Sequence, residues 1–244
     1  MQLQGKLALV TGGTDGIGAQ LIRQLRDKGV TVITSGRNPE RIAATRAAGF
    51  EVIEADLSTH EGIAALVAGV NDRPIELLVN NAGMGVDHDF REAVPDVAEA
   101  DRAIFLNLNA PIHLIVALLP GLRARAEAGF EATIVNVTSG LAIAPRAGGP
   151  VYCATKAGLR SYTQALRAQL AGSRVHVIEA LPPVVETRMT AARTSKKMPA
   201  GECARQIVAA IERNATEANV GLVKLLQAVN SVSPALARRI MLRF

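Results

Sequence analysis

Six short apolar segments alternate with helix-like segments along most of the chain, and this alternation limits the folds that it can adopt. The apolar segments lie at residues 6–12, 30–36, 51–58, 75–83, 132–140 and 174–183. Several read as near-continuous apolar runs, which is typical of strands buried on both faces of a parallel sheet. Because parallel strands need crossover helices and such crossovers are right-handed, we expect an α/β protein with a doubly wound, mostly parallel sheet.

The segments between these strands carry helix signals. Asn38 followed by Pro39 predicts a helix start, because Asn caps helices well and Pro suits the first turn. Further helices are expected at about 60–70, 96–127 and 152–171. No linker rich in Pro, Gly or Ser and no internal repeat divides the 244 residues. We therefore expect a single Rossmann-fold domain over 1–244.

Composition argues against a nucleic-acid-binding protein. The chain has a net charge of +5, but its Lys and Arg residues are scattered, and aromatic residues make up only 3% with no Trp. Striped basic surfaces and aromatic stacking platforms are the usual signs of nucleic-acid binding. The partner expected is therefore a small molecule.

Cysteine and histidine spacing predicts neither disulfides nor a metal site. The two cysteines, Cys153 and Cys203, form no framework or metal-type cluster, and no histidine has a ligand partner at metal spacing. The N-terminus shows no apolar signal region, and the longest apolar run is broken by His113 and Pro120. We expect a cytoplasmic protein with no stable membrane insertion.

Glycine-rich and polar residues follow the strands, at the edge where open α/β sheets bind ligands. After the first strand, the sequence TGGTDGIG places Gly12, Gly16 and Gly18 before a helix. Such a loop lets the backbone and the helix N-terminus approach a pyrophosphate. The spacing G-x-x-x-G-x-G differs from the usual G-x-G-x-x-G fingerprint. Taken alone, it fits either a dinucleotide site or a glycine-rich turn.

Tyr152 and Lys156 lie four residues apart just after a Gly-Gly-Pro loop. On a helix these positions are neighbours on one face. The pair alone fits either a surface Tyr beside a solvated Lys or a catalytic pair.

Over residues 5–190 the chain resembles the short-chain dehydrogenase/reductase family. TGGTDGIG resembles the family's TGxxxGIG loop, NNAG at 80–83 matches its motif of the same letters, and YCATK is similar to its YxxxK. The segment LPPVVET resembles PGxxxT, with Pro183 in place of Gly. That Pro-Pro pair, with GRN after the second strand, is similar to the DltE-type branch.

The resemblance implies a catalytic set of Asn107, Ser139, Tyr152 and Lys156 and an interconversion of a carbonyl and an alcohol. Tyr152 would act as general acid/base, Ser139 would orient the substrate oxygen, and Asn107 would hold a water linked to Lys156. A Lys ammonium about 5 Å away would lower a Tyr pKa by about two units at an effective dielectric near 20. We expect this charge to bring Tyr152 near the working pH. The alternative is a non-catalytic, dinucleotide-sensing binding protein on the same fold.

The expected cofactor is NADP(H) in preference to NAD(H). The tip of the second strand meets the adenosine ribose in this fold, and it carries Gly36 and Arg37 with no acid to select NAD. Arg37 suits a 2′-phosphate, and Arg41 could add a second charge, whereas Asp15 would oppose it. The full expected cofactor set, most of it implied by the resemblance, is Gly12, Thr14, Asp15, Gly16, Ile17, Gly18, Arg37, Asp56, Leu57, Asn81, Ala82, Gly83, Tyr152, Lys156, Val185 and Thr187.

Two C-terminal segments remain. Residues 187–203 are expected to form the substrate loop; its basic residues fit either a solvated mobile loop or an acidic or phosphorylated substrate. Residues 219–244 form an extension with a faint strand expected near 220–223 and a basic, amphipathic last helix capped by Ser233. That helix is expected to pack on its own domain or on a sister subunit, with membrane-surface binding as the alternative. The resemblance implies a homodimer or homotetramer formed through the helices that carry Asn107 and Tyr152.

Overall fold

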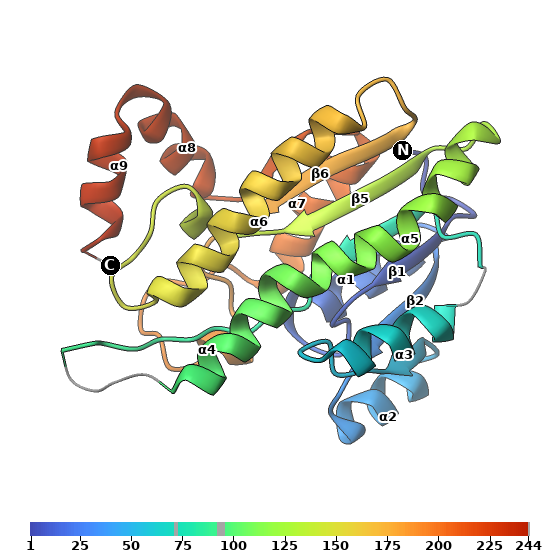
Figure 1. Cartoon of the computed structure of the whole chain (residues 1–244), viewed down its shortest axis with the longest axis horizontal. Helices are drawn as coiled ribbons and strands as arrows, with labels where there is room; N and C mark the ends of the chain where they lie inside the picture. Colours follow the sequence, from blue (N-terminus) through green and yellow to red (C-terminus); the bar gives the residue numbers. More distant parts are fainter. Residues whose placement is uncertain (71–72, 92–95, 244) are drawn as a thin grey trace.

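The computed structural model describes residues 1–70, 73–91 and 96–243, and these contain a parallel sheet between two helical layers (Figure 1). Its seven strands lie in the order β3-β2-β1-β4-β5-β6-β7, and every pair is parallel. This confirms the doubly wound α/β fold. The strands are β1 Leu7–Val10, β2 Thr31–Gly36, β3 Glu51–Glu54, β4 Leu77–Asn80, β5 Ala132–Val137, β6 Val175–Leu181 and β7 Glu217–Asn219.

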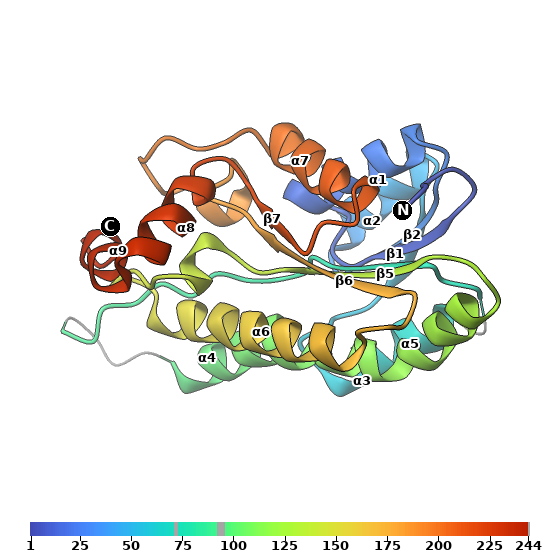
Figure 2. The same ribbon diagram turned by 90° about the horizontal axis from the view of Figure 1, so that it is seen from above.

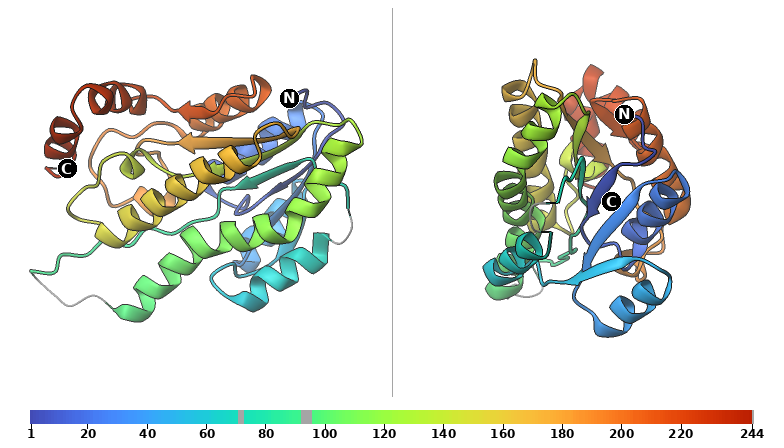
Figure 3. Two further views of the ribbon diagram at one scale, coloured as in Figure 1. Left: turned by 45° about the horizontal axis from the view of Figure 1, so that its top comes forward. Right: turned by 90° about the vertical axis from the view of Figure 1, so that its right-hand side faces the viewer.

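Helices cover both faces of the sheet. Figure 2 shows α1, α2 and α7 on one face and α3, α4, α5 and α6 on the other, with α8 and α9 at one end. The two further views in Figure 3 show the same layers. The α-helices are α1 Gly16–Asp27, α2 Pro39–Ala47, α3 His60–Val70, α4 Val97–Ile104, α5 Ala110–Glu127, α6 Pro150–Gln169, α7 Ala200–Glu212, α8 Val223–Val232 and α9 Pro234–Met241. Shorter turns are the π-helix η1 Phe105–Asn109 and the 3-10 turns η2 Gly140–Ala142 and η3 Arg188–Thr190.

The central strands are apolar throughout because both of their faces are covered. In β4, Leu77 and Val79 pack into the cluster under α1 and α7, whereas Leu78 packs into the cluster under α3 and α5. In β5, Val135 faces the first cluster and Ile134 the second. Successive side chains of a strand point to opposite faces, so a strand between two helical layers needs apolar residues at every position.

The predicted helix starts agree with the observed caps. Asn38 accepts a hydrogen bond from the Arg41 main-chain N–H at 2.9 Å, and Ser233 accepts one from the Leu236 N–H at 3.3 Å. Each cap satisfies a donor that the first turn of a helix leaves free.

Two elements differ from the sequence-based expectation. The region 96–127 is not a uniform helix, since a π-turn separates α4 from α5. The last strand lies at β7, before the expected 220–223, because Gly221 takes a positive φ of 55° and its N–H bonds to Gln206, which turns the chain into α8. Val223 is therefore the first residue of a helix and not part of a strand.

The helical run Val97–Glu127 is long and apolar enough to cross a membrane by length and composition. His113 and Pro120, which were expected to break this run, lie inside α5 and do not end the helix. In the structure this run lies along the sheet, and Leu114, Ile115 and Leu122 are buried in the core cluster beside α3.

Candidate active site

The carboxyl ends of β1 and β4 meet at the centre of the sheet. The chain leaves β1 toward β2 on one side and leaves β4 toward β5 on the other, so the strand order reverses at this point. In open α/β sheets such a reversal opens a crevice in which ligands bind. The glycine loop follows β1 and the NNAG motif includes the end of β4, so both lie at this crevice.

The glycine loop is packed too tightly for side chains. A Cβ added to Gly18 would lie 2.2 Å from the Gly12 carbonyl oxygen and 2.5 Å from Asn81 Nδ2. Gly12 and Gly16 have φ values of +68° and +54°, which L residues with a side chain rarely adopt. Asp15 caps α1 by accepting a hydrogen bond from the Gly16 N–H at 2.8 Å. The loop therefore brings the main chain that leads into α1 close to neighbouring main chain, with the Asp15 side chain at the first turn of the helix.

Three other segments touch this loop. A Cβ on Gly12 would lie 3.0 Å from Ala82 Cα, and one on Gly16 would lie 3.1 Å from Thr187. Thr14 approaches the tip of β2, since a Cβ on Gly36 would lie 2.6 Å from the methyl carbon of Thr14. The structure thus brings together the predicted cofactor residues that follow β1, β2, β4 and β6.

Three predicted cofactor residues direct their side chains elsewhere. Leu57 and Val185 are buried in the two core clusters, and Ile17 packs against one of them. Any contact that these residues make at the crevice would therefore involve their main chain.

Ion pairs at the tip of β2 differ from the simple expectation. Arg37 pairs with Asp56 at 3.2 Å, and Arg41 pairs with Asp15 at 2.9 Å. Arg188 of η3 also approaches Asp15, at 3.3 Å. Partial burial disfavours the charged form of Asp56, but hydrogen bonds from Ser58 and the charge of Arg37 hold its pKa below the usual value. Asp15 therefore carries two cationic partners, and its expected repulsion of a 2′-phosphate is offset.

Lys156 lies one turn after Tyr152 on α6 and is only 4% exposed, so it is not a solvated surface residue. Its Nζ donates a hydrogen bond to the Val137 carbonyl oxygen at 2.9 Å and lies 5.8 Å from the centre of the Tyr152 ring. Burial lowers the pKa of Lys156 to about 8. A cation is thus held beneath the tyrosine ring.

Tyr152 and Ser139 come together at the end of β5. Burial raises the pKa of Tyr152 above its ordinary value, outweighing a hydrogen bond with Ser139 and the positive charge of Arg193. The sequence-based expectation that Tyr152 titrates near neutral pH is therefore not met by the protein alone. The cause is desolvation, which disfavours the phenolate and which sequence spacing does not reveal.

Asn107 is fully buried in η1 and binds the chain beyond β4. Its Oδ1 accepts from the Met84 N–H at 2.9 Å, and its Nδ2 donates to the Met84 carbonyl oxygen at 2.8 Å. A Cβ on Gly83 would lie 3.0 Å from Asn107 Oδ1 and 3.6 Å from Lys156 Nζ. Asn107 therefore fixes the main chain that passes directly beside Lys156.

A buried charged group lies beside the end of β5. Thr138 donates a hydrogen bond to Glu179 at 2.7 Å, and Arg160, one turn beyond Lys156 on α6, pairs with Glu179 at 2.6 Å and with Glu217 at 3.1 Å. Burial raises the pKa of Glu179, although Thr138 and Arg160 oppose the shift. Sequence reasoning did not single out these residues, since their partners lie in different strands.

Asp87 and Arg146 were also missed. Arg146 Nη2 pairs with Asp87 Oδ1, and Arg193 Nη2 lies 3.3 Å from Asp87 Oδ2. The available signal was the position of Arg146 beside the Gly-Gly-Pro turn that precedes Tyr152. Its partner is 59 residues away, beyond the reach of any local pattern.

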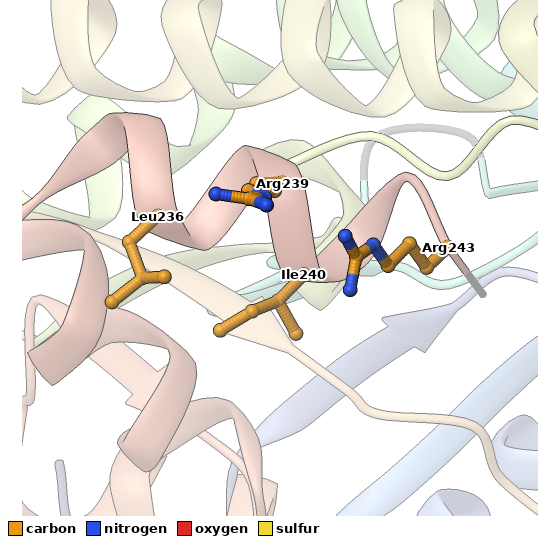
Figure 4. Close-up of a pocket in the computed structure, with 4 residues that line it drawn as sticks. All are labelled: Leu236, Arg239, Ile240 and Arg243. Carbon is orange, nitrogen blue, oxygen red and sulfur yellow. The ribbon is translucent and has the colours of Figure 1, made fainter.

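A shallow cavity of about 460 Å³ lies away from these residues, on the C-terminal helix. It is lined by Leu236, Arg239, Ile240 and Arg243 (Figure 4). Helix α8, which precedes α9, packs near η2, since a Cβ on Gly140 would lie 2.9 Å from Val223. No predicted site residue lines the cavity.

The strand order and the glycine loop at its reversal point are typical of a dinucleotide-binding α/β protein. A family profile described as short chain dehydrogenase matches residues 6–198. The chain therefore belongs to the short-chain dehydrogenase family and is an NAD(P)-dependent oxidoreductase of that family.

Individual relatives agree with this assignment. An uncharacterized oxidoreductase, DltE of Bacillus subtilis, is 38% identical and aligns over 77% of this chain and 74% of that protein. The ketoacyl reductase HetN of a Nostoc species is 32% identical over 98% of this chain and 88% of that protein. A short chain dehydrogenase of Burkholderia cenocepacia, solved with NADP, covers 99% of each chain at a TM-score of 0.87 and 27% identity. The similarity to DltE agrees with the branch that the Pro-Pro segment indicated.

Proposed function

We propose that this protein is an NADP(H)-dependent oxidoreductase that interconverts a carbonyl and an alcohol, with Tyr152 as general acid and base. The observation that carries the proposal is the placement of the Lys156 ammonium 5.8 Å from the Tyr152 ring, in a site where Lys156 is only 4% exposed. The similarity to a ketoacyl reductase supports a carbonyl substrate.

The raised pKa of Tyr152 suits the acid role. A phenol with a raised pKa stays protonated at neutral pH and can donate its proton to an alkoxide that develops on the substrate. The cation at Lys156 then stabilises the phenolate that remains, since two opposite charges in a buried site attract strongly. In the reverse direction the same phenolate removes the proton from an alcohol.

Ser139 and Asn107 complete the proposed catalytic set. Ser139 acts to lower the pKa of Tyr152, and we assign its hydroxyl the role of orienting the same substrate oxygen. Asn107 is assigned a positioning role, because both polar atoms of its side chain bond to the Met84 main chain. The water that the family resemblance assigns to Asn107 would therefore need another contact, such as a main-chain carbonyl of the π-turn.

The crevice fits a dinucleotide cofactor. The glycine loop leads into the N-terminus of α1, where main-chain N–H groups can bind a pyrophosphate, and Gly12 and Gly18 pack too closely against neighbouring main chain to carry a Cβ. Asp56 lies where an adenine contact is proposed, and Asn81, Ala82, Gly83 and Thr187 would line the remaining length. When bound, the cofactor donates or accepts the hydride.

NADP(H) is favoured over NAD(H) by the charges at the tip of β2. Arg37 is half-exposed there with Arg41 nearby, and Asp56 and Asp15 hold the two guanidinium groups in place. The Burkholderia relative was solved with NADP, which agrees with this preference. We expect Arg37→Asp to lower kcat/KM with NADPH about 10- to 100-fold, with Arg23→Asp on α1 as an exposed control. A wild-type preference for NADH would refute the assignment.

The assembly proposed is a homodimer or homotetramer formed through the helices that carry Asn107 and Tyr152. Val97 and Val116 are about two-thirds exposed, at 68% and 67%, on the helical run that covers this face of the sheet. A sister subunit packed on this run would cover both side chains. Sedimentation at micromolar concentration tests this, and a monomer would contradict it.

Two buried free cysteines agree with a reduced, cytoplasmic setting.

Replacement of Tyr152 by Phe tests the assigned reaction. Phe keeps the ring and removes the hydroxyl, so turnover of a carbonyl panel with NADPH should fall at least 100-fold. Tyr162→Phe, on the same helix, is the matched control and should keep wild-type turnover. Unchanged turnover in Tyr152→Phe would refute the mechanism.

A further inference from the structure

Two arginines from separate loops share one carboxylate near Tyr152. Arg146 comes from the loop between η2 and α6, Arg193 from the segment after η3, and Asp87 from the segment after β4. In Figure 1 the segments after β4, β5 and β6 lie at the same end of the sheet. We name these residues the Asp87 cluster.

The Asp87 cluster lies over the first turn of α6, which carries Tyr152. A Cβ on Gly149 would lie 3.0 Å from Arg146 Nη2 and 3.2 Å from Asp87 Oδ1, and Gly149 immediately precedes α6. Cys153 Sγ lies 3.8 Å from the Arg146 carbonyl oxygen. The positive charges of Arg193 and Arg146 also act to lower the pKa of Tyr152, although burial raises it overall.

The cluster has more positive charge than Asp87 can pair. Two guanidinium groups face one carboxylate, and among the described residues the buried Nε of Arg146 has no hydrogen-bond partner. The adjacent His88 likewise has two buried ring nitrogens without a partner in the described part of the chain. Buried polar groups without partners are uncommon in folded proteins and call for a ligand or another explanation.

We propose that Arg146 and Arg193 bind an anionic group, a carboxylate or a phosphate, on the carbonyl substrate. This inference rests on the proposed function, because it places the reacting carbonyl at Tyr152. A guanidinium presents several donors in one plane and matches carboxylate and phosphate oxygens in a bidentate contact. Asp87 positions the two side chains before substrate binds, and its half-exposed carboxylate gives way to the substrate anion.

The same placement gives Arg193 a specificity role. Arg193 belongs to the proposed substrate loop, and its ion pair with Asp87 holds that loop against the segment that follows β4. A substrate anion that takes over part of this pairing would hold the loop in the same position. Neutral carbonyl compounds provide no such contact, so they should bind more weakly while reacting at the same Tyr152.

The test compares matched substrates with NADPH. One pair is a 3-oxo carboxylate and its methyl ester; the other is a phosphorylated hydroxyketone and its unphosphorylated parent. We expect the wild type to have a higher kcat/KM for the anion than for the neutral compound in one of the two pairs. Arg193→Gln should lower this ratio about 10- to 100-fold, mainly by raising the KM of the anion. Arg146→Gln should act in the same direction, whereas Lys196→Gln on the same loop should change nothing.

The outcomes separate this inference from the proposed function. Equal use by the wild type of the charged and the neutral member of both pairs, or an anion preference that survives in Arg193→Gln, would overturn the inference and leave the carbonyl reaction standing. A binding readout without turnover is the rise in Tm produced by the matching hydroxy acid or phosphorylated alcohol. That rise should be present in the wild type and lost in Arg193→Gln even if no carbonyl is reduced. A wild type that shows no such rise would also count against the inference.

Discussion

Lys156 should make the stability of this protein rise with pH in a range where most proteins are losing stability. Its side chain is 4% exposed, and burial lowers its pKa from 10.5 to about 8. In the unfolded chain the lysine regains its ordinary pKa. Between these two values the folded state binds fewer protons than the unfolded state, so raising the pH favours folding.

The size of the effect follows from the shift. Below pH 8 both states are protonated, and the full cost of the buried charge, about 3 kcal/mol, weakens the fold. Between pH 7.5 and 9.5 about 2 kcal/mol of this cost should be relieved as the folded lysine loses its proton. Above the unfolded pKa both states are neutral and the difference stops changing.

Lys156→Met isolates this contribution, because methionine has a similar length and no charge. Urea unfolding followed by circular dichroism at pH 7.5, 8.5 and 9.5 gives the free energy of unfolding of each protein. From pH 7.5 to 9.5 the free energy of unfolding of the wild type should rise by about 2 kcal/mol relative to that of the variant. The buried thiol of Cys203, whose pKa is raised to about 12, and that of Cys153 act equally in both proteins and cancel. Parallel curves for the two proteins would show that Lys156 is not held in a desolvated site.

Three further substitutions test the surroundings of the site. Gly18→Ala places a Cβ 2.2 Å from main chain, so thermal unfolding should show a loss of about 1–3 kcal/mol together with weakened NADPH binding; an unchanged Tm would refute the packing argument. Asn107→Ala leaves the N–H and carbonyl of Met84 unpaired and should cost about 2 kcal/mol in urea unfolding, which an unchanged midpoint would contradict. Arg160→Gln leaves Glu179 buried without its cation and should lower the free energy of unfolding by about 3–5 kcal/mol at pH 7. At lower pH the carboxyl is protonated and part of this loss should be recovered. A loss that stays constant with pH would count against a charged Glu179.

The fold was predictable because its signals are local and repeated. The central strands are apolar at every position, as in β4 from Leu77 to Val79, and caps such as Asn38 and Ser233 are read from short stretches. The short β7 was misplaced because three residues carry almost no pattern, and Gly221, which turns the chain into α8, could equally have ended a longer strand.

The candidate site was less predictable than the fold. Sequence spacing placed Tyr152 and Lys156 on one helical face, but it did not reveal that burial raises the pKa of Tyr152 and lowers that of Lys156. Both shifts depend on which distant segments exclude water from the site. Asp87 and Arg146 escaped notice for the same reason, since their contact joins loops that only the tertiary fold brings together.

The π-turn η1 is the geometry that one extra residue produces when it is inserted into an α-helix. One residue corresponds to a rotation of about 100° around the helix axis. The extra residue in η1 therefore rotates the side chains of α4 by this angle relative to those of α5. Removing one residue from Phe105–Asn109 would rotate every side chain beyond it, and Asn107 could no longer reach Met84 while α5 kept its buried leucines.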